Sequence, residues 1–339
     1  MKLIDTKDAV GQVLCHDITQ IIKDVKKGPA FRKGHVITED DIDLLLSLGK
    51  EHIYVWEKDE TMLHEDEAAQ ILADICMGCN TYQNQPSEGK IEIFSSMDGV
   101  LRIDREALMA VNTMDRMMIA SRHGDRPIKK GDKIAGTRII PLVIEKDVMN
   151  TVKTQVGNRK IFNVEPYIPK KAGIVTTGNE VLYGRIEDTF TPVVREKVTE
   201  YGATILGEKI SGDDPEMIIS SIRELLDKGA EMIFCTGGMS VDPDDRTPLA
   251  IKTVAAEVVT YGAPVLPGAM FMLGYIDGEI PIMGLPGCVM YAGRTIFDLV
   301  LPRIMTGEKI TREIFDSYGE GGLCLGCKVC NFPNCGFGI

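Results

Sequence analysis

Cys235-Thr-Gly-Gly-Met-Ser-Val-Asp-Pro-Asp-Asp-Arg-Thr-Pro248 is the stretch that predicts the fold of the C-terminal half of this chain. Its first residue ends an apolar run typical of a buried strand, and the two glycines that follow permit a close backbone approach. Thr247 as a capping residue and Pro248 in the first turn indicate that a helix begins there. A loop between a strand end and a helix start presents N–H groups to an anion such as a phosphate.

Three carboxylates lie in the same loop, at Asp242, Asp244 and Asp245. They would repel a phosphate unless a divalent cation stood between them, and Mg²⁺ commonly binds one or two carboxylates together with substrate phosphates. The alternative interpretation is a solvated, aspartate-rich turn.

Strands and helices alternate from Lys171 onward. After a predicted strand, a capping residue followed by proline starts a helix three times, at Thr191-Pro192, Asp214-Pro215 and Thr247-Pro248. Such alternation is typical of a mostly parallel, doubly wound α/β sheet, in which ligands bind beyond the carboxyl ends of the strands.

The residue pattern divides the whole chain into four parts. We expect a small β-rich lobe over residues 1–60, an α+β lobe with a linker over 61–165, the α/β domain over 166–306 and a cysteine-rich tail over 307–339. Within the second lobe, the polar character of residues 146–170 indicates the linker, and an apolar helix is expected over Val289–Ile304.

The net charge and the apolar content of the chain argue against some classes of function. A net charge of −12 and a pI near 5.0 argue against binding to nucleic acid or to an anionic membrane. No apolar run approaches the length of a membrane span, and the N-terminus has no secretory signal, so we expect a cytoplasmic protein.

Three separated motifs carry a family resemblance: Thr176-Thr-Gly-Asn-Glu180, Thr236-Gly-Gly-Met-Ser-Val241 with Asp245, and Leu285-Pro-Gly287. In this order they resemble the motifs of the molybdopterin-binding domain shared by the MogA and MoeA proteins of molybdenum cofactor biosynthesis and by gephyrin. The resemblance covers about residues 168–305 and implies a MogA-like fold.

The resemblance also implies a site for molybdopterin or its adenylated form. The residues that would hold the phosphate and the pterin are Thr176, Thr177, Gly178, Asn179, Glu180, Asp213, Gly237, Gly238, Ser240, Val241, Pro286 and Gly287. Asp188 and Asp245 would bind a metal such as Mg²⁺ or act on an adenylated intermediate. By the same resemblance we expect a homo-oligomer, with a pterin or nucleotide as its small-molecule partner and other molybdenum cofactor proteins as candidate partners.

Departures from the family leave enzyme activity open. Where the molybdenumtransferase members carry Pro-Gly-Lys-Pro this chain has Ala269 in place of the lysine, and Cys288 replaces the asparagine of their Leu-Pro-Gly-Asn-Pro. One hypothesis is a role in molybdenum cofactor biosynthesis, including metal insertion. A second is a non-catalytic carrier or sensor of the cofactor, and a third is a nucleotide-pyrophosphate hydrolase. Ser95–Gly99 is similar to another family segment and equally typical of a turn.

Four cysteines fall within twelve residues of the tail, at Cys324, Cys327, Cys330 and Cys335. Structural zinc sites usually separate two cysteine pairs by a longer loop, so spacings of two, two and four favour an iron–sulfur cluster. Zinc, or ordinary thiols on a disordered tail, are the alternatives.

Overall fold

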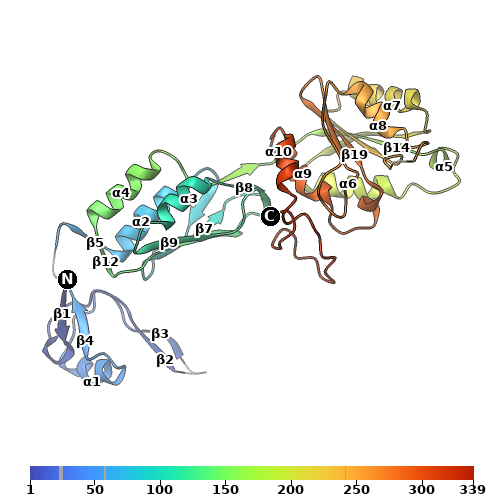
Figure 1. Cartoon of the computed structure of the whole chain (residues 1–339). Helices are drawn as coiled ribbons and strands as arrows, with labels where there is room; N and C mark the ends of the chain where they lie inside the picture. The colour runs from blue at the N-terminus through green and yellow to red at the C-terminus, as the bar shows by residue number, and fades with distance from the viewer. Residues whose placement is uncertain (23–25, 57–58, 241) are drawn as a thin grey trace. The chain divides into compact units, whose positions relative to one another are not determined.

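The computed structural model describes residues 1–22, 26–56, 59–240 and 242–339, which form two compact units (Figure 1). The first unit comprises Met1–Phe94, Asp104–Ser121 and Lys133–Phe162. The second comprises Ser95–Ile103, Arg122–Asp132 and Asn163–Ile339. Every helix in the described ranges is too short or too polar to cross a lipid bilayer.

The first unit begins with a small β-rich part. Antiparallel β1 pairs with β4, β2 pairs with β3, and α1 packs its Leu45 into a core with Leu14, Phe31 and Ile53. Thr38 and Asp41 form a capping box at the start of α1. The elements are β1 Lys2–Asp5, η1 Thr6–Asp8, β2 Ile18–Ile22, β3 Lys26–Phe31, α1 Glu39–Ser47 and β4 His52–Val55.

The remainder of the first unit combines helices with a four-stranded sheet of order β6-β7-β11-β9. Its elements are β5 Met62–His64, α2 Glu65–Cys76, β6 Thr81–Gln83, β7 Lys90–Ser95, α3 Arg105–Asn112, β9 Met117–Ser121, β11 Lys133–Ile139, β12 Val143–Glu145 and α4 Lys146–Val156. The linker predicted over residues 146–170 is therefore wrong. Met149, Val152 and Val156 recur at helical spacing and are buried, so a short apolar stripe forms a helix inside a mostly polar segment.

The second unit contains a six-stranded sheet of order β15-β14-β16-β19-β18-β17 and a three-stranded sheet of order β10-β8-β13. The first four strands of the larger sheet are parallel, as predicted for a mostly parallel sheet. β18 is antiparallel to β19, and β17 is antiparallel to β18. The strands are β8 Gly99–Ile103, β10 Arg126–Ile128, β13 Phe162–Pro166, β14 Lys171–Thr177, β15 Thr204–Ser211, β16 Met232–Thr236, β17 Glu257–Tyr261, β18 Met272–Ile276 and β19 Ile280–Leu285.

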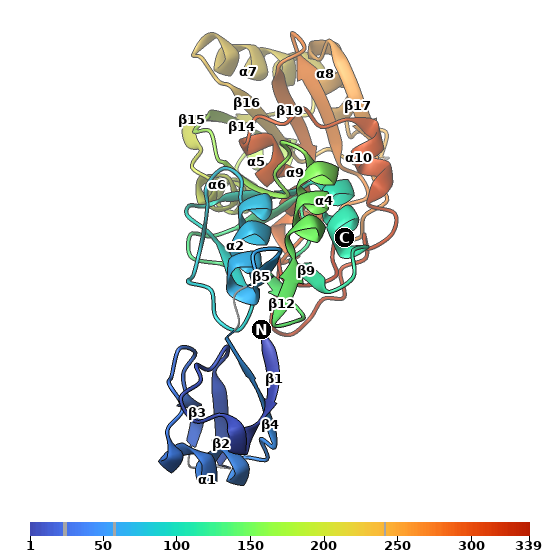
Figure 2. The ribbon, with the colours of Figure 1, turned by 90° about the vertical axis from the view of Figure 1, so that its left-hand side faces the viewer.

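Helices cover both faces of the six-stranded sheet (Figure 2). The helices are α5 Asn179–Leu182, α6 Phe190–Glu200, α7 Pro215–Asp227, α8 Thr247–Val254, η2 Gly287–Met290, α9 Ile296–Met305 and α10 Arg312–Ser317. Side chains of α6, α9 and α10 share a core with Ile174 and Phe234, whereas those of α7 and α8 pack on Val175 and Ile233. Because neighbouring strand residues point to opposite faces, the apolar strand runs feed both cores and the doubly wound α/β fold is confirmed.

The helix expected over Val289–Ile304 is shorter than predicted. A 3-10 turn ends at Met290, and α9 begins only after Thr295, which forms a capping box with Asp298. The tail beyond α10 is also packed on the domain, since Phe337 is buried in the core of the second unit.

Candidate functional site

Four parallel strands end side by side at the carboxyl edge of the sheet. Thr177 pairs in register with Ser211, Thr176 with Thr236, and Thr236 with Leu285. The loops that follow these four strands therefore emerge along one edge. The three sequence motifs and the loop that carries Asp213 are brought together there.

The loop after β14 is held by the loop after β15. Gly178 has a φ of 138° and donates its N–H to the carbonyl of Ser211 at 3.1 Å. The backbone N–H of Asn179 donates to the Asp213 carboxylate at 3.0 Å, and Glu180 is exposed. Asp213 thus fixes the start of the short helix α5.

The two glycines after β16 allow one loop to press on another. Gly237 has a φ of 81°, and a Cβ there would lie 2.2 Å from the carbonyl oxygen of Thr177. A Cβ at Gly238, whose φ is 53°, would lie 2.8 Å from the Thr247 hydroxyl. Gly287, in contrast, has no atom within 4 Å of an added Cβ, so the motif after Pro286 borders open space.

Threonine hydroxyls connect these loops beneath the edge. The hydroxyl of Thr177 lies 2.9 Å from that of Thr247 and donates to the Thr236 carbonyl at 3.1 Å. The hydroxyl of Thr176 lies 2.8 Å from that of Thr191 and accepts from that of Thr236 at 3.2 Å. All five side chains are buried, so the network fixes the positions of the loops. Thr191 and Thr247 were assigned only to helix starts from the sequence.

Asp188 joins the same network. Its carboxylate accepts hydrogen bonds from the backbone N–H groups of Phe190 and Thr191 at 2.9 and 3.0 Å, and from the Thr191 hydroxyl at 2.5 Å. It therefore satisfies free N–H groups at the beginning of α6.

Asp245 holds the loop between β16 and α8 together. The backbone N–H of Ser240 donates to its carboxylate at 2.7 Å, and Asp242 accepts from the N–H of Asp244 at 3.1 Å. Val241, a predicted binding residue, lies outside the described residues. The predicted cap Thr247 is wrong, because Thr247 is the first helical residue of α8 and its side chain is engaged by Thr177.

Within the described ranges, one group of at least three ligand atoms lies within 4.8 Å of one another, formed by His64, Glu65 and Asp66 in the first unit. His64 accepts from Asp66 N–H and contacts the Cys15 carbonyl, so this group is the capped start of α2. Neither the edge carboxylates nor the tail thiols are gathered so closely. Mg²⁺ at the edge would depend on a ligand phosphate to complete its coordination.

The two residues that depart from the family, Ala269 and Cys288, supply neither a charge nor a reactive thiolate. Cys288 is half-buried, and desolvation raises the pKa of its thiol, which disfavours a reactive thiolate. The carbonyl of Ala269 accepts from Ala263 N–H at 3.0 Å in the turn before β18. Neither residue supplies the positive charge that a lysine at position 269 would bring.

Comparisons with known proteins give two family matches. Residues 173–306 match a family described as a probable molybdopterin binding domain, and residues 3–57 match a domain of unknown function, DUF8806. A CinA-like protein of Mycobacterium avium is 38% identical over 80 residues, which are 24% of this chain and 18% of that protein. The matched segment is thus less than a fifth of the relative's length.

Solved structures resemble the same part of the chain. The molybdopterin biosynthesis enzyme MoaB of Thermus thermophilus is 23% identical, covers 41% of this chain and 98% of its own, and has a TM-score of 0.35. CinA of Thermoplasma acidophilum is 18% identical, covers 35% and 89%, and has a TM-score of 0.31.

The family match and the doubly wound sheet coincide in the segment that carries the three motifs. Residues 173–306 of this chain thus match the family described as a probable molybdopterin binding domain.

Proposed function

We propose that the carboxyl edge of the six-stranded sheet binds molybdopterin or its adenylated form, and that the chain acts in molybdenum cofactor biosynthesis. The observation that carries this proposal is the convergence of four loops, from Thr177, Ser211, Thr236 and Leu285, at one edge within the matched domain. In open α/β sheets this edge is where ligands bind.

The charges at the edge favour a phosphate bound together with Mg²⁺. Asp188, Asp213 and Asp245 lie on three of the converging loops, while Arg185 and Arg246 lie on two of them. In the part of the chain that is described, neither arginine has an ion-pair partner. The arginines can attract a phosphate, and a divalent cation would offset its repulsion from the carboxylates.

Ala269 favours binding without metal insertion. A lysine at this position could neutralise charge on a transferred oxyanion, whereas alanine cannot. The turn that carries Ala269 is also paired with the tail, because Leu266 donates to Gly322 and accepts from Cys324, both at 2.8 Å. A carrier or sensor of the cofactor is therefore the second candidate function. A nucleotide-pyrophosphate hydrolase is the third candidate, so the test also looks for a nucleotide ligand.

Mass spectrometry of small molecules released from the full chain, purified without oxygen, tests the substrate class. A phosphorylated pterin, with or without an adenylate, is expected. A nucleotide without a pterin would replace this proposal with nucleotide-pyrophosphate hydrolysis.

A further inference from the structure

The four tail cysteines, which the proposed function does not use, line one pocket of the second unit. Cys324, Cys327, Cys330 and Cys335 all border a cavity of about 530 Å³. Cys324 and Cys335 are half-buried, Cys327 and Cys330 are exposed, and all four are free thiols. All four cysteines of residues 324–335 thus border a common space.

The backbone of the tail is tied to the domain on both sides of the four cysteines. Residue 323 forms a parallel bridge with residue 266, and Gly338 N–H donates to the Gly321 carbonyl at 2.8 Å. A Cβ at Gly322 would lie 2.4 Å from the carbonyl oxygens of Pro264 and Tyr318, so the chain passes where only glycine fits. The pocket is a built part of the fold.

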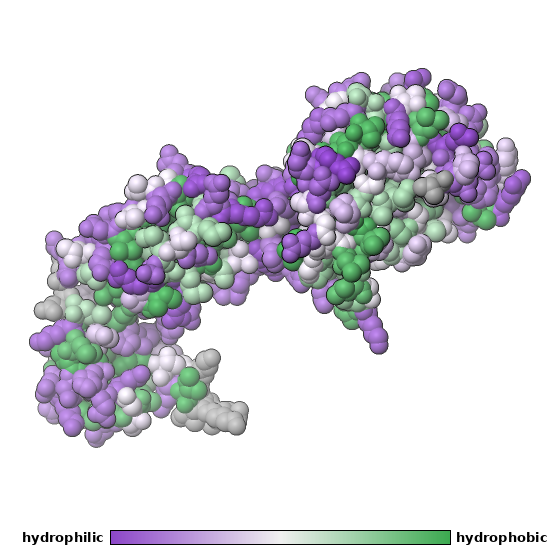
Figure 3. Space-filling view, in the orientation of Figure 1, coloured by the Kyte–Doolittle hydropathy of each residue, from purple (hydrophilic) through white to green (hydrophobic). Residues whose placement is uncertain are grey.

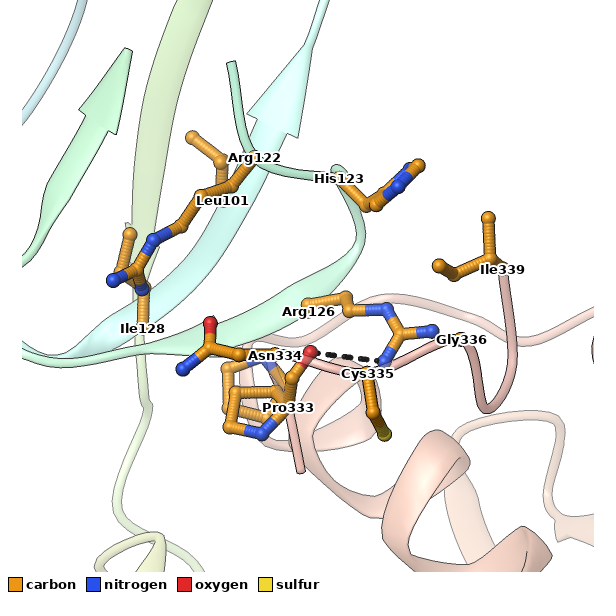
Figure 4. Close-up of a pocket in the computed structure, with 11 residues that line it drawn as sticks. Leu101, Arg122, His123, Arg126, Ile128, Pro333, Asn334, Cys335, Gly336 and Ile339 are labelled. Carbon is orange, nitrogen blue, oxygen red and sulfur yellow. Dashed lines mark hydrogen bonds between the residues drawn. The ribbon is translucent and has the colours of Figure 1, made fainter. Parts of the chain in front are cut away.

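Two arginines place positive charge beside the thiols. The guanidinium of Arg126 lies 5.8 Å from the ring centre of Phe332, and that of Arg294 lies 5.0 Å from it. Arg294 is already paired with the buried carboxylate of Asp298 at 2.8 Å, whereas Arg126 is not paired with a carboxylate among the described residues. Figure 4 shows Arg126 next to Cys335, with its hydrogen bond to the carbonyl of Pro333.

Arg126 is a buried cation that has no carboxylate partner among the described residues. It is only 6% exposed, and its guanidinium donates to the carbonyl oxygens of Pro333, at 3.1 Å, and Phe337. A buried charge without a counter-charge is costly. An anionic group in the adjoining thiol pocket would supply the missing negative charge.

The sequence spacing and the size of the pocket favour a cluster over zinc. Structural zinc sites usually separate two cysteine pairs by a longer loop, whereas spacings of two, two and four are close to the bacterial ferredoxin run. The cavity of about 530 Å³ that the four cysteines line has room for a group larger than a single ion. The walls are largely apolar, and Figure 3 shows hydrophobic residues gathered on the projecting tail, where Leu323, Leu325 and Val329 are exposed.

We infer that Cys324, Cys327, Cys330 and Cys335 bind a [4Fe–4S] cluster, and that Arg126 balances part of its negative charge. Four thiolates complete the coordination of such a cluster, and the spacing is close to that of the bacterial ferredoxin run. This inference goes beyond the proposed function, because cluster binding can be measured without any pterin.

Anaerobic reconstitution of the full chain with ferrous iron and sulfide tests the cluster. We expect about four iron and four sulfide atoms per chain, with a Mössbauer spectrum of a cubane centre. Cys327→Ser should reduce bound iron several-fold, whereas Cys79→Ser, an exposed cysteine of the first unit, should leave it unchanged. Zinc in place of iron in the protein as purified, no metal, or equal iron in both variants would overturn the inference.

The role of Arg126 has a separate readout. In Arg126→Gln the reduction potential of the cluster should become more negative, because a cation that favours the reduced, more negative state is lost. The matched control is Arg116→Gln, which removes an exposed arginine paired with Glu145 in the first unit. A potential that is the same in both variants would remove Arg126 from the proposal.

Discussion

A substitution of the single residue Asp245 tests whether a metal ion assists the binding of a phosphate. Asp245→Asn retains an oxygen that can accept from Ser240 N–H but removes the negative charge. We expect Mg²⁺-dependent affinity for the pterin to fall by about tenfold or more, since a charged hydrogen-bonding partner is worth about 1.5–3 kcal/mol. Titration calorimetry with and without Mg²⁺ measures the effect.

Asp227→Asn is the matched control, because Asp227 is exposed and lies at the end of α7, outside the loops of the carboxyl edge. Equal affinities for the two variants in Mg²⁺ would contradict a metal-binding role for Asp245.

Gly237 tests the contact between the two loops. Gly237→Ala would place a Cβ 2.2 Å from the Thr177 carbonyl, whereas Gly262→Ala, also at positive φ, meets its nearest atom at 3.6 Å. Backbone strain alone costs about 1–3 kcal/mol in either variant, and the steric clash adds to it only at Gly237. Calorimetric melting should therefore show a clearly lower midpoint for Gly237→Ala. Equal midpoints would mean that the loops do not depend on this close approach.

The sequence placed the predicted site residues on the right loops but did not show their hydrogen-bond partners. Asp188 and Asp245 were predicted from the resemblance, but the contacts that hold them, with Thr191 and Ser240, depend on loop geometry. Thr177 and Thr247 are 70 positions apart in the chain, so only the register of the sheet brings their hydroxyls together. No local pattern could have shown that contact.

Glu65, the first residue of α2, should make the stability of the first unit depend on pH. Glu65 is 9% exposed, and burial, reinforced by the charge of Asp66, raises the pKa of its carboxyl to about 7. Between about pH 4.5 and 7 the folded chain keeps this proton while the unfolded chain loses it, so stability falls as the pH rises. In the wild type the free energy of unfolding should fall by up to about 3 kcal/mol as the pH rises from about 4.5 to past 7. Glu65→Gln should remove this fall.

Chemical unfolding of the first unit, followed through Trp56 fluorescence from pH 4 to 8, measures this slope. Glu106→Gln is the control, because that carboxylate is 90% exposed. Parallel pH profiles for the wild type and Glu65→Gln would show that the carboxyl is not responsible.

Elements were predicted where an apolar pattern and a cap agree. Asp214 caps α7 as expected. The helix Lys146–Val156 was missed because only three of its residues are buried and the other eight are not. Thr247 was wrongly assigned as a cap, because its hydroxyl contacts that of Thr177 instead. Local signals fail where tertiary packing decides.

Assembly is the prediction for the whole molecule. We expect the full chain to form a homo-oligomer, so light scattering across a concentration series should give a mass of at least twice the 37.3 kDa of one chain. A mass of one chain at every concentration would contradict this prediction.

At this scale the sequence indicated the α/β domain and the cysteine spacing, but not the packing of the tail. The pocket of the tail depends on contacts with Leu266 and Arg126, which are about 60 and 200 positions away in the chain. A spacing pattern contains no information about such distant contacts.

The most direct test of the central claim is an anaerobic titration of the full chain with molybdopterin, in Mg²⁺ and in EDTA. The account predicts saturable binding that weakens in EDTA and is lost in Gly237→Ala but retained in Gly262→Ala. Absence of saturable binding by the wild type, or binding that Gly237→Ala leaves unchanged, would contradict the assignment of the carboxyl edge as a molybdopterin site.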